Sequence, residues 1–278
     1  MLEGAGKNWY WFLKKLKIKE RFGGKKMEKK IALVTGGLSG MGKASVLALA
    51  EKGYEVVVFD IQDEKADGVI AQCKKMKGNA VYRSCNLMDS KAIDSAFQFI
   101  RDTYGHLDCA LNNAGTGILS KPFAETTEEE MDKLIGLDLK AYMLCMVHEI
   151  HMMEQTGFGR IVNVASGSGL CASKGMALYS ACKHGVCGLT KAAALDYADK
   201  NITINAIAPG TIETELVLYY KEHNPEEYKE WCKSNPKGRL GRPDEIARVV
   251  SFLFEEESDF INGIVIPVDS GCVAGSWK

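Results

Sequence analysis

The sequence predicts a single α/β domain, built as a doubly wound parallel β-sheet with helices on both faces. The first observation is that short runs rich in β-branched residues alternate with longer helix-like segments from residue 31 onward. Strands that alternate with helices are joined by right-handed crossovers, which leave the sheet parallel and covered on both faces. The second observation is that 278 residues with 46% hydrophobic content can bury one large core. The third is that no repeat and no Pro-, Ser- or Gly-rich linker divides the chain.

The predicted elements follow one another in this alternation. The strand-like runs are, in order, Ile31–Thr35, Glu55–Asp60, Ala80–Ser84, Leu107–Leu111, Arg160–Ala165, Ile202–Ile207 and Ile264–Val268. The helix-like stretches include Lys43–Lys52, Ser90–Thr103, Glu129–Glu154 and Ser180–Asp199. Residues 214–237 are rich in Tyr, Glu and Lys and interrupt the alternation before the last helix and strand. We expect this segment to form an inserted lid.

Residues 1–30 differ from the rest of the chain and form a basic, aromatic N-terminal extension. They carry ten Lys and Arg residues against three Glu residues, with Trp9, Tyr10, Trp11 and Phe12 among them. The segment has neither a small-residue cleavage site nor a sustained apolar stretch, so it does not resemble a signal peptide. We expect its aromatic side chains to pack on the chain's own domain or on a neighbouring subunit. A disordered leader and a basic amphipathic helix on a membrane surface are the alternatives.

Composition and charge exclude several classes of partner. A net charge of −1 at pH 7 gives no general attraction to nucleic acid or anionic lipid. No apolar run approaches the ~20 residues needed to span a bilayer. The nine cysteines are scattered and include no Cys-x-x-Cys pair, a pattern typical of reduced thiols in the cytoplasm. We therefore expect a cytoplasmic protein with no metal site, no nucleic-acid partner and no membrane-spanning segment.

A glycine-rich turn after the first strand has the context of a dinucleotide-binding loop. The strand Ile31–Thr35 runs into Gly36-Gly-Leu-Ser-Gly40-Met-Gly42, and a helix-like stretch follows. Glycines in this position let a pyrophosphate approach the N–H groups at the start of a helix. Asp60 ends the next strand about 20 residues further on, where a carboxylate accepts hydrogen bonds from an adenosine ribose. The sequence thus predicts a Rossmann-type site with loop residues Gly36, Leu38, Ser39, Gly40, Met41 and Gly42.

The spacing Thr-Gly-x-x-x-Gly-x-Gly resembles the short-chain dehydrogenase/reductase family, and further motifs of that family recur in order. They are Asn112-Asn113-Ala114-Gly115 after the fourth strand, Ser166 after the fifth, Tyr179-x-x-x-Lys183, and Pro209-Gly210 after the sixth. The resemblance covers residues 31 to about 270 and leaves out the N-terminal extension. It implies that residues 31–278 form an NAD-binding catalytic domain. It also implies a homotetramer with the 129–154 and 180–199 helices at an interface.

Within this resemblance, Asp60 determines the choice of cofactor. Its carboxylate would repel the 2′-phosphate of NADP, and the positions where NADP-using members carry Arg or Lys hold Leu38, Ser39 and Ile61. We therefore expect NAD. The resemblance assigns further residues to the cofactor: Asn86 and Leu87 at the adenine, Asn112, Asn113, Ala114 and Gly115 along the riboses, and Pro209, Gly210, Thr211, Ile212 and Thr214 near the nicotinamide carboxamide.

The chemical site is expected at Tyr179 and Lys183. Interconversion of a ketone and an alcohol needs a group that gives the oxygen a proton or removes one, while hydride moves at carbon. A lysine four residues after a tyrosine lies on the same helical face, and its ammonium favours the ionised phenol, as does the helix dipole. By resemblance, Lys183 also holds the nicotinamide ribose, and Ser166 orients the substrate oxygen toward Tyr179. Ser168 is an alternative whose position fits less well.

One position departs from the family pattern. The family commonly has Asn followed by Leu or Val in the helix before the fifth strand, and this chain reads Leu137-Asp138-Leu139. That asparagine is thought to kink the helix and to fix a water that links the lysine to solvent. Asp138 can hold water too, and its charge would stabilise the Lys183 ammonium. We therefore expect Asp138 to be a functional-site residue, with its role left open.

The lid and the run after Ser166 give the sequence information on the substrate. Residues Glu215–Tyr220 offer apolar and aromatic surface rather than a cluster of cations, which disfavours a phosphorylated substrate. The lid and the Gly-x-Gly-Leu run after Ser166 resemble bacterial hydroxysteroid dehydrogenases, so we expect a small apolar alcohol or ketone, foremost a hydroxysteroid. A 3-oxoacyl-thioester reductase and a polyol dehydrogenase are alternatives within the same chemistry. A non-catalytic NAD-sensing regulator, or a membrane-surface or scaffold protein that uses the N-terminal extension, would belong to another class.

Overall fold

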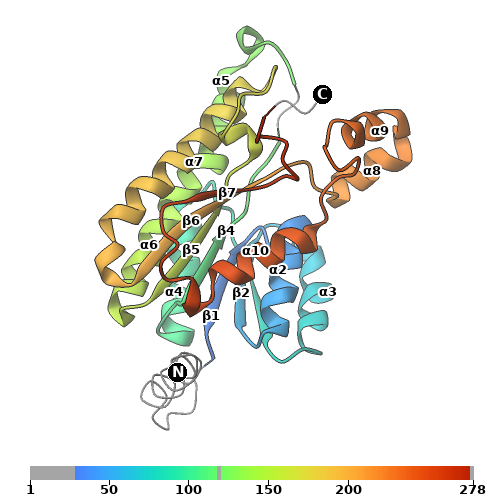
Figure 1. Cartoon of the computed structure of the whole chain (residues 1–278). Coiled ribbons are helices and arrows are strands. Elements are labelled where there is room, and N and C mark those ends of the chain that lie inside the picture. The colour runs from blue at the N-terminus through green and yellow to red at the C-terminus, as the bar shows by residue number, and fades with distance from the viewer. Residues whose placement is uncertain (1–28, 118–119, 276–278) are drawn as a thin grey trace, which may run out of the picture.

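The centre of the protein is a seven-stranded parallel sheet with the strand order β3-β2-β1-β4-β5-β6-β7 (Figure 1). The structure is a computed structural model, and it describes residues 29–117 and 120–275 apart from the side chain of Leu216. The predicted doubly wound α/β fold is confirmed. The expected packing of the N-terminal extension concerns residues 1–28, which lie outside the described ranges.

The helices and strands alternate as the sequence predicts. The strands are β1 (Ile31–Thr35), β2 (Glu55–Asp60), β3 (Asn79–Ser84), β4 (Cys109–Asn112), β5 (Gly159–Val164), β6 (Ile202–Pro209) and β7 (Val265–Val268). The helices are α2 (Gly40–Glu51), α3 (Asp63–Cys73), α4 (Ser90–Tyr104), α5 (Glu128–Ile135), α6 (Ala141–Thr156), α7 (Ala177–Asp196), α8 (Glu215–His223), α9 (Pro225–Lys233) and α10 (Pro243–Leu253).

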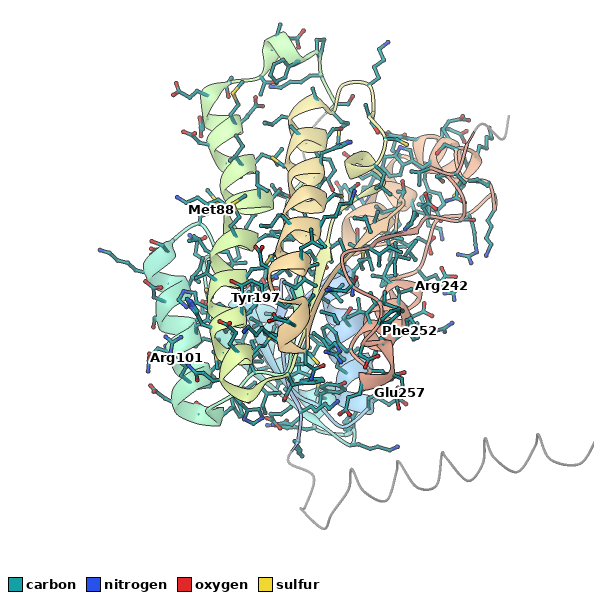
Figure 2. The ribbon with its side chains drawn as sticks, turned by 60° about the vertical axis from the view of Figure 1, so that its left-hand side comes forward. Met88, Arg101, Tyr197, Arg242, Phe252 and Glu257 are labelled. Carbon is teal, nitrogen blue, oxygen red and sulfur yellow. The ribbon has the colours of Figure 1, made fainter. Side chains whose placement is uncertain are left out.

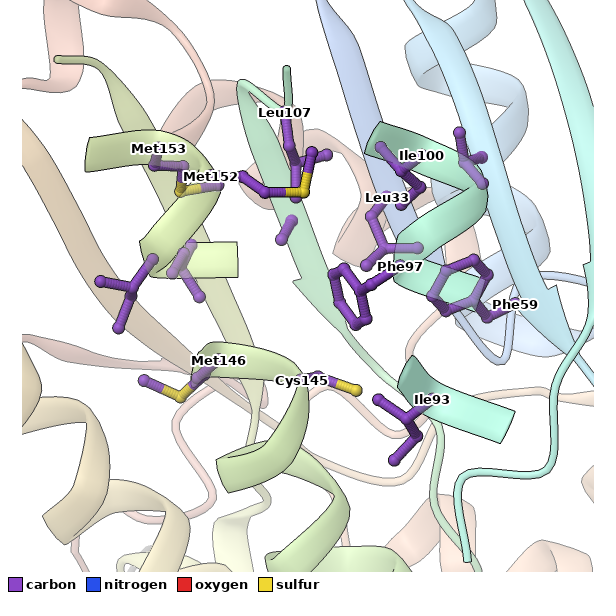
Figure 3. Close-up of a cluster of buried hydrophobic side chains, with 14 of the residues drawn as sticks. Leu33, Phe59, Ile93, Phe97, Ile100, Leu107, Cys145, Met146, Met152 and Met153 are labelled. Atoms are coloured by element: carbon purple, nitrogen blue, oxygen red, sulfur yellow. The ribbon is translucent and has the colours of Figure 1, made fainter. Parts of the chain in front are cut away.

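Two layers of helices cover the sheet. Helices α2, α3 and α10 pack on one face, and α4, α6 and α7 pack on the other. Figure 2 shows Arg101 of α4 and Arg242 at the start of α10 on the outside of the two layers. Figure 3 shows the core under α4 and α6, where the Phe97 ring meets the edge of the Phe59 ring at a centroid distance of 5.4 Å. The apolar faces of these helices thus fix the sheet from both sides.

Most element boundaries agree with the predictions, and the differences have local causes. β1 and β2 have the predicted bounds, whereas the expected strand Leu107–Leu111 begins only at Cys109. The Asp108 carboxylate accepts a hydrogen bond from the Ile31 N–H at 2.7 Å, so its side chain caps the start of this strand pair. Helix α3 was not among the predicted helices, because its buried face is narrow and consists of Ala66, Val69 and Cys73.

The predicted long helix 129–154 is present but contains a π-helical turn. α5 and α6 are joined by Gly136–Lys140, and this turn carries Asp138. The predicted lid, 214–237, contains α8 and α9. Among the described residues, no helix has both the length and the apolar character that crossing a membrane requires.

The sheet places the expected site residues at one edge. All strands are parallel, so their carboxyl ends lie together, and the chain crosses from one side of the sheet to the other between β1 and β4. Ligands of open α/β sheets bind at this switch point. Thr35 at the end of β1, Asp60 at the end of β2 and Asn112 at the end of β4 converge there.

Candidate active site

The loop between β1 and α2 has the backbone that its glycines predict. Gly36 and Gly40 have φ angles of +64° and +50°, a conformation that other residues rarely adopt. A Cβ atom on Gly42 would lie 2.0 Å from the Gly36 carbonyl oxygen, so the start of α2 touches the loop. This close backbone packing brings N–H groups at the start of α2 to the sheet edge, and the arrangement fits a dinucleotide pyrophosphate.

The Asp60 carboxylate is fixed at the end of β2. The residue is 6% exposed. One carboxylate oxygen accepts a hydrogen bond from the Leu38 N–H at 3.0 Å, and the other accepts from the N–H groups of Ile61 and Gln62 at 2.7 and 3.1 Å. The carboxylate therefore ties the glycine loop to β2. Leu38 takes part only through its backbone, because its side chain is buried behind the loop.

A cleft of about 630 Å³ opens beside the glycine loop, a volume typical of a small-molecule site. Most of the predicted cofactor residues line this one cleft, namely Gly36, Ser39, Gly40, Met41, Asp60, Ile61, Asn86, Leu87, Asn113, Ala114, Gly115 and Thr214. The structure therefore brings together residues from the ends of β1, β2, β3 and β4 and from the beginning of the lid.

Asn112, the last residue of β4, and Asn113, which follows it, face opposite ways. The Asn113 amide donates to the carbonyl oxygens of Thr35 and Gly36 at 3.0 and 3.1 Å, so it holds its loop against the glycine loop. The Asn112 amide instead donates to Glu149 Oε2 and Asn163 Oδ1, both at 3.0 Å, and the residue is 1% exposed. The expectation that Asn112 lines the cofactor pocket is therefore wrong, because successive side chains of a strand alternate in direction.

The residues after β6 divide between two cavities. Thr214 lines the glycine-loop cleft. Gly210, Thr211 and Ile212 line a neighbouring cavity of about 400 Å³, and Pro209 is the last residue of β6. The expected contact of this segment with a nicotinamide carboxamide stays a prediction.

Ser166, Tyr179 and Lys183 come from two neighbouring elements. α7 begins at Ala177, so Tyr179 lies in its first turn and Lys183 one turn later. The Lys183 Nζ atom lies 5.7 Å from the centroid of the Tyr179 ring. Ser166 follows β5, and its hydroxyl accepts a hydrogen bond from the Ser168 N–H at 3.1 Å. The turn after Ser166 packs on α7, since a Cβ atom on Gly169 would lie 2.7 Å from the Lys183 carbonyl oxygen.

The Lys183 ammonium is enclosed by three oxygen atoms. Nζ lies 3.1 Å from Asp138 Oδ1 in an ion pair, 3.2 Å from the Val164 carbonyl oxygen and 3.4 Å from the Tyr142 hydroxyl. The other oxygen of Asp138 accepts a hydrogen bond from the Thr116 N–H at 3.0 Å. The side chains of Lys183 and Asp138 are 4% and 1% exposed. Asp138 therefore joins Lys183 to the loop after β4.

Burial and charge perturb the ionisable groups of this cluster. Burial raises the pKa of Asp138, although the Lys183 ammonium and the Thr116 N–H oppose that shift. Burial by itself lowers the pKa of Lys183, but Tyr142, Tyr179 and Asp138 outweigh it and hold that pKa above its usual range. Burial also raises the pKa of Tyr142 to about 12. The cluster thus places Lys183, whose pKa is raised, beside a Tyr142 phenol that is uncharged at neutral pH.

The cleft also contains residues that the sequence did not indicate. Lys65 and Gln62 line it near Asp60, and the Lys65 ammonium donates to Gln62 Oε1 at 2.6 Å. Glu215 lines it at the start of α8, and its carboxylate accepts a hydrogen bond from the Gly40 N–H at 2.8 Å. The position of Lys65 depends on α3, which was not predicted. No local sequence signal could have paired Glu215 with a loop 175 residues away.

Comparison with known proteins agrees with this geometry. The family model adh_short_C2, described as enoyl-(acyl carrier protein) reductase, matches residues 36–273. The cyclohexanol dehydrogenase of Acinetobacter sp. (strain SE19) is 39% identical over 250 residues, which cover 90% of this chain and 97% of that protein. The 3β-hydroxysteroid dehydrogenase of Mediterraneibacter gnavus is 32% identical, with coverage of 88% and 95%. The chain belongs to the short-chain dehydrogenase/reductase family.

Solved structures extend the similarity to three dimensions. The crystal structure of levodione reductase has a TM-score of 0.84 and 31% sequence identity, and covers 89% of this chain and 98% of its own. ElxO with NADP bound has a TM-score of 0.85 and 30% identity, with coverage of 89% and 100%. The protein is thus an oxidoreductase that acts on alcohol or ketone substrates with a nicotinamide dinucleotide.

Proposed function

We propose that the protein is an NAD(H)-dependent dehydrogenase that interconverts a secondary alcohol and a ketone on a bulky apolar substrate, such as a hydroxysteroid. The observation that carries the proposal is the position of Tyr179 and Lys183 on one face of α7, beside the turn that begins at Ser166. When bound, the nicotinamide supplies or accepts the hydride. The residues of the chain then have to orient the oxygen of the substrate and handle its proton.

Tyr179 handles the proton in this proposal. Its hydroxyl gives a proton to the ketone oxygen during reduction and removes the alcohol proton during oxidation. Ser166 donates a hydrogen bond to the same oxygen and orients it. The Lys183 ammonium, 5.7 Å from the Tyr179 ring, favours the ionised phenol during oxidation. Asp138 belongs to the site through its ion pair with Lys183.

The cleft beside the glycine loop would hold the dinucleotide. The N–H groups at Gly40 and Met41 would bind the pyrophosphate, and Asp60 the adenosine ribose. The buried Asp60 carboxylate supports NAD, because a 2′-phosphate beside it would meet a fixed negative charge. Lys65 is the cation that would favour NADP, but its ammonium is hydrogen-bonded to Gln62. The remaining predicted cofactor residues complete the proposed site: Gly36, Leu38, Ser39, Gly42, Ile61, Asn86, Leu87, Asn113, Ala114, Gly115, Pro209, Gly210, Thr211, Ile212 and Thr214.

The lid and the relatives support an apolar ring substrate. Leu218 and Tyr219 of α8 are 41% and 56% exposed, and the Tyr220 ring packs on Trp231 of α9 at 5.2 Å. Three similar proteins are named for cyclohexanol, levodione and a 3β-hydroxysteroid, all of which are alicyclic. An apolar lid matches such a substrate, because burial of the ring surface under aromatic and aliphatic side chains lowers the free energy of the complex.

The experiment is a substrate and cofactor screen on the wild type and on Tyr179→Phe. We expect the highest kcat/KM with a 3-oxosteroid and NADH, ahead of cyclohexanone, an acetoacetyl thioester and a sugar ketone. Tyr179→Phe should lower turnover by about 100-fold or more while NADH binding, followed by fluorescence, changes little. Tyr197→Phe, at the far end of α7, is the matched control and should keep full activity.

Each part of the proposal has its own contrary result. More than a few per cent of activity in Tyr179→Phe would assign the proton to another group. Equal kcat/KM with NADPH and NADH would refute the preference for NAD. A preference for the acetoacetyl thioester would replace the substrate class. NADH binding without turnover of any substrate in the panel would indicate a non-catalytic NAD sensor.

The proposal includes a cytoplasmic homotetramer, with residues 31–278 as the catalytic domain, residues 214–237 as its lid and residues 1–30 as an extension. Exposed apolar side chains on the expected interface helices support it, since Met143 and Val147 of α6 are 41% and 52% exposed and Leu195 of α7 is 81% exposed. All nine cysteines are unpaired, as suits a reducing compartment. Size-exclusion chromatography with light scattering gives the subunit number, and a monomer would refute this part.

A further inference from the structure

The ion pair between Asp138 and Lys183 is buried, with side chains that are 1% and 4% exposed. A Cβ atom added to Gly115 would lie 2.7 Å from Asp138 Oδ1 and 3.6 Å from Lys183 Nζ, so the loop after β4 closes over the pair. Val164 and Tyr142 close it from β5 and α6. A buried ion pair of this kind is screened far less than one at the surface.

We propose that Asp138 is a positioning residue that neutralises Lys183, and that it thereby raises the pH at which the active site loses its first proton. The inference rests on the proposed roles of Tyr179 and Lys183. In addition to those roles, the negative charge of the Asp138 carboxylate offsets the positive charge of the Lys183 ammonium. The active site therefore keeps its proton up to a higher pH.

Charges and distances around Tyr179 give the size of this effect. The Lys183 ammonium lies 5.7 Å from the centroid of the Tyr179 ring, and by Coulomb attraction it favours the loss of a proton from the active site. The Asp138 charge lies only 3.1 Å from that ammonium and has the opposite sign, so it cancels part of the effect. We expect the cancelled part to be about one pH unit.

Among the described residues, no other group around the Asp138–Lys183 pair supplies a negative charge in place of Asp138. Tyr142 faces it from α6, and Tyr179, Cys182 and Cys187 face it from α7. Burial raises the pKa of Tyr142 and of both thiols, so these three groups are uncharged at neutral pH. β5 presents a carbonyl oxygen, and the loop after β4 presents the Thr116 N–H.

The effect does not depend on which group releases the proton. Tyr179 and Lys183 interact strongly, so the first proton belongs to the pair rather than to one residue. Removal of the Asp138 charge makes the whole cluster one unit more positive, and a more positive cluster releases its first proton at a lower pH. The wild-type site therefore keeps its proton up to a higher pH than a site without the Asp138 charge, which favours donation of a proton to a ketone over removal of a proton from an alcohol.

The variant Asp138→Asn removes the negative charge of the side chain and keeps its hydrogen bond. The asparagine side chain has nearly the same shape, and its amide oxygen can still accept from the Thr116 N–H. Asp132→Asn, at an exposed position on α5 six residues earlier, is the matched control. Asp138→Ser is a second neutral variant, smaller and still able to accept a hydrogen bond.

The test has two readouts. The first is the pH dependence of kcat for alcohol oxidation, in which the midpoint of the acid limb should move about one unit lower in Asp138→Asn and remain in place in Asp132→Asn. The second is the ultraviolet absorbance of tyrosinate in the protein without cofactor, taken as the difference between each variant and the same variant carrying Tyr179→Phe. This difference is the tyrosinate absorbance of Tyr179. Its midpoint should lie about one pH unit lower in the variants that lack the Asp138 charge.

Unchanged or upward-shifted curves in both neutral variants would overturn the inference. Failure of both neutral variants to fold would also overturn it, because Asp138 would then act by holding the loop after β4. These results are distinguishable from failure of the proposed function, which would appear as activity in Tyr179→Phe.

Discussion

Glu149 is a second buried carboxyl group, and it makes the stability of the fold depend on pH. It lies in α6 with 0% exposure, and burial raises the pKa of its side chain to about 8. The Asn112 amide donates to Oε2 at 3.0 Å, whereas Oε1 has no hydrogen-bond partner among the described residues. The folded protein therefore keeps a proton on Glu149 at neutral pH, where the unfolded chain has lost it.

The sign and size of the change in stability follow from the linkage between proton binding at Glu149 and folding. Below the ordinary pKa of 4.5, both states hold the proton and the group contributes nothing to the pH dependence. Between that value and about 8 the folded state binds more protons, so the free energy of unfolding falls as the pH rises. The loss amounts to about 3 kcal/mol between about pH 5.5 and pH 8, and it levels off above that.

Glu149→Gln should remove most of this dependence. The glutamine amide oxygen can still accept from Asn112, and the side chain has no proton to lose. We expect the variant to match the wild type near pH 5.5 and to exceed it by about 2–3 kcal/mol near pH 8. Urea unfolding at several pH values measures the difference, with Glu154→Gln, at an exposed position on the same helix, as control. Parallel stability curves for the wild type and Glu149→Gln would refute the reasoning.

Three further predictions concern cofactor binding. Asp60→Ala should reduce the ratio of NADH to NADPH affinity by about tenfold, because it removes a charged hydrogen-bond acceptor for the ribose and a charge that repels the 2′-phosphate. An unchanged ratio of affinities, measured by calorimetry, would argue against this role of Asp60. Lys183→Ala should lower both turnover and NADH affinity, each by about tenfold or more, and loss of only one in kinetics and binding assays would contradict its double role. Glu215→Gln should tighten NADH binding about two- to fivefold, because the Glu215 carboxylate occupies the Gly40 N–H and repels a phosphate. The exposed Glu222→Gln is the control for this last variant, and equal dissociation constants for both would refute it.

The sequence was sufficient wherever a local pattern determines the structure. The bounds of β1 and β2 follow from uninterrupted apolar runs, and the glycine loop follows from backbone angles that Gly36 and Gly40 can adopt. The Tyr179–Lys183 pair needs only helical spacing. These features depend on residues that are close together in the chain.

The remaining features depend on packing between distant segments. The sequence could not show whether Asn112 or Asn113 faces the cleft, because that depends on where β4 ends. The contact of Glu215 with Gly40 depends on how the lid folds back over the loop. Lys65 was missed because α3 has too few apolar residues to stand out as a helix. The family motif located Asp138, but its 3.1 Å contact with Lys183 comes from the π-helical turn before α6.

Asp138 and Glu149 are connected, because one face of the α5–α6 helix carries both. Asp138, Tyr142, Cys145 and Glu149 are spaced by four, three and four residues, and each is at most 2% exposed. On these predictions, Asp138 affects the rate of alcohol oxidation and Glu149 affects the stability of the fold. As the pH rises, the rate increases and the stability decreases. A wild-type rate profile near pH 8 therefore combines faster proton removal with a less stable fold. For this reason the Asp138→Asn comparison is best repeated in the Glu149→Gln background. If the midpoint shift is the same there, it reports the chemistry of the site; if it disappears, the wild-type profile was reporting unfolding.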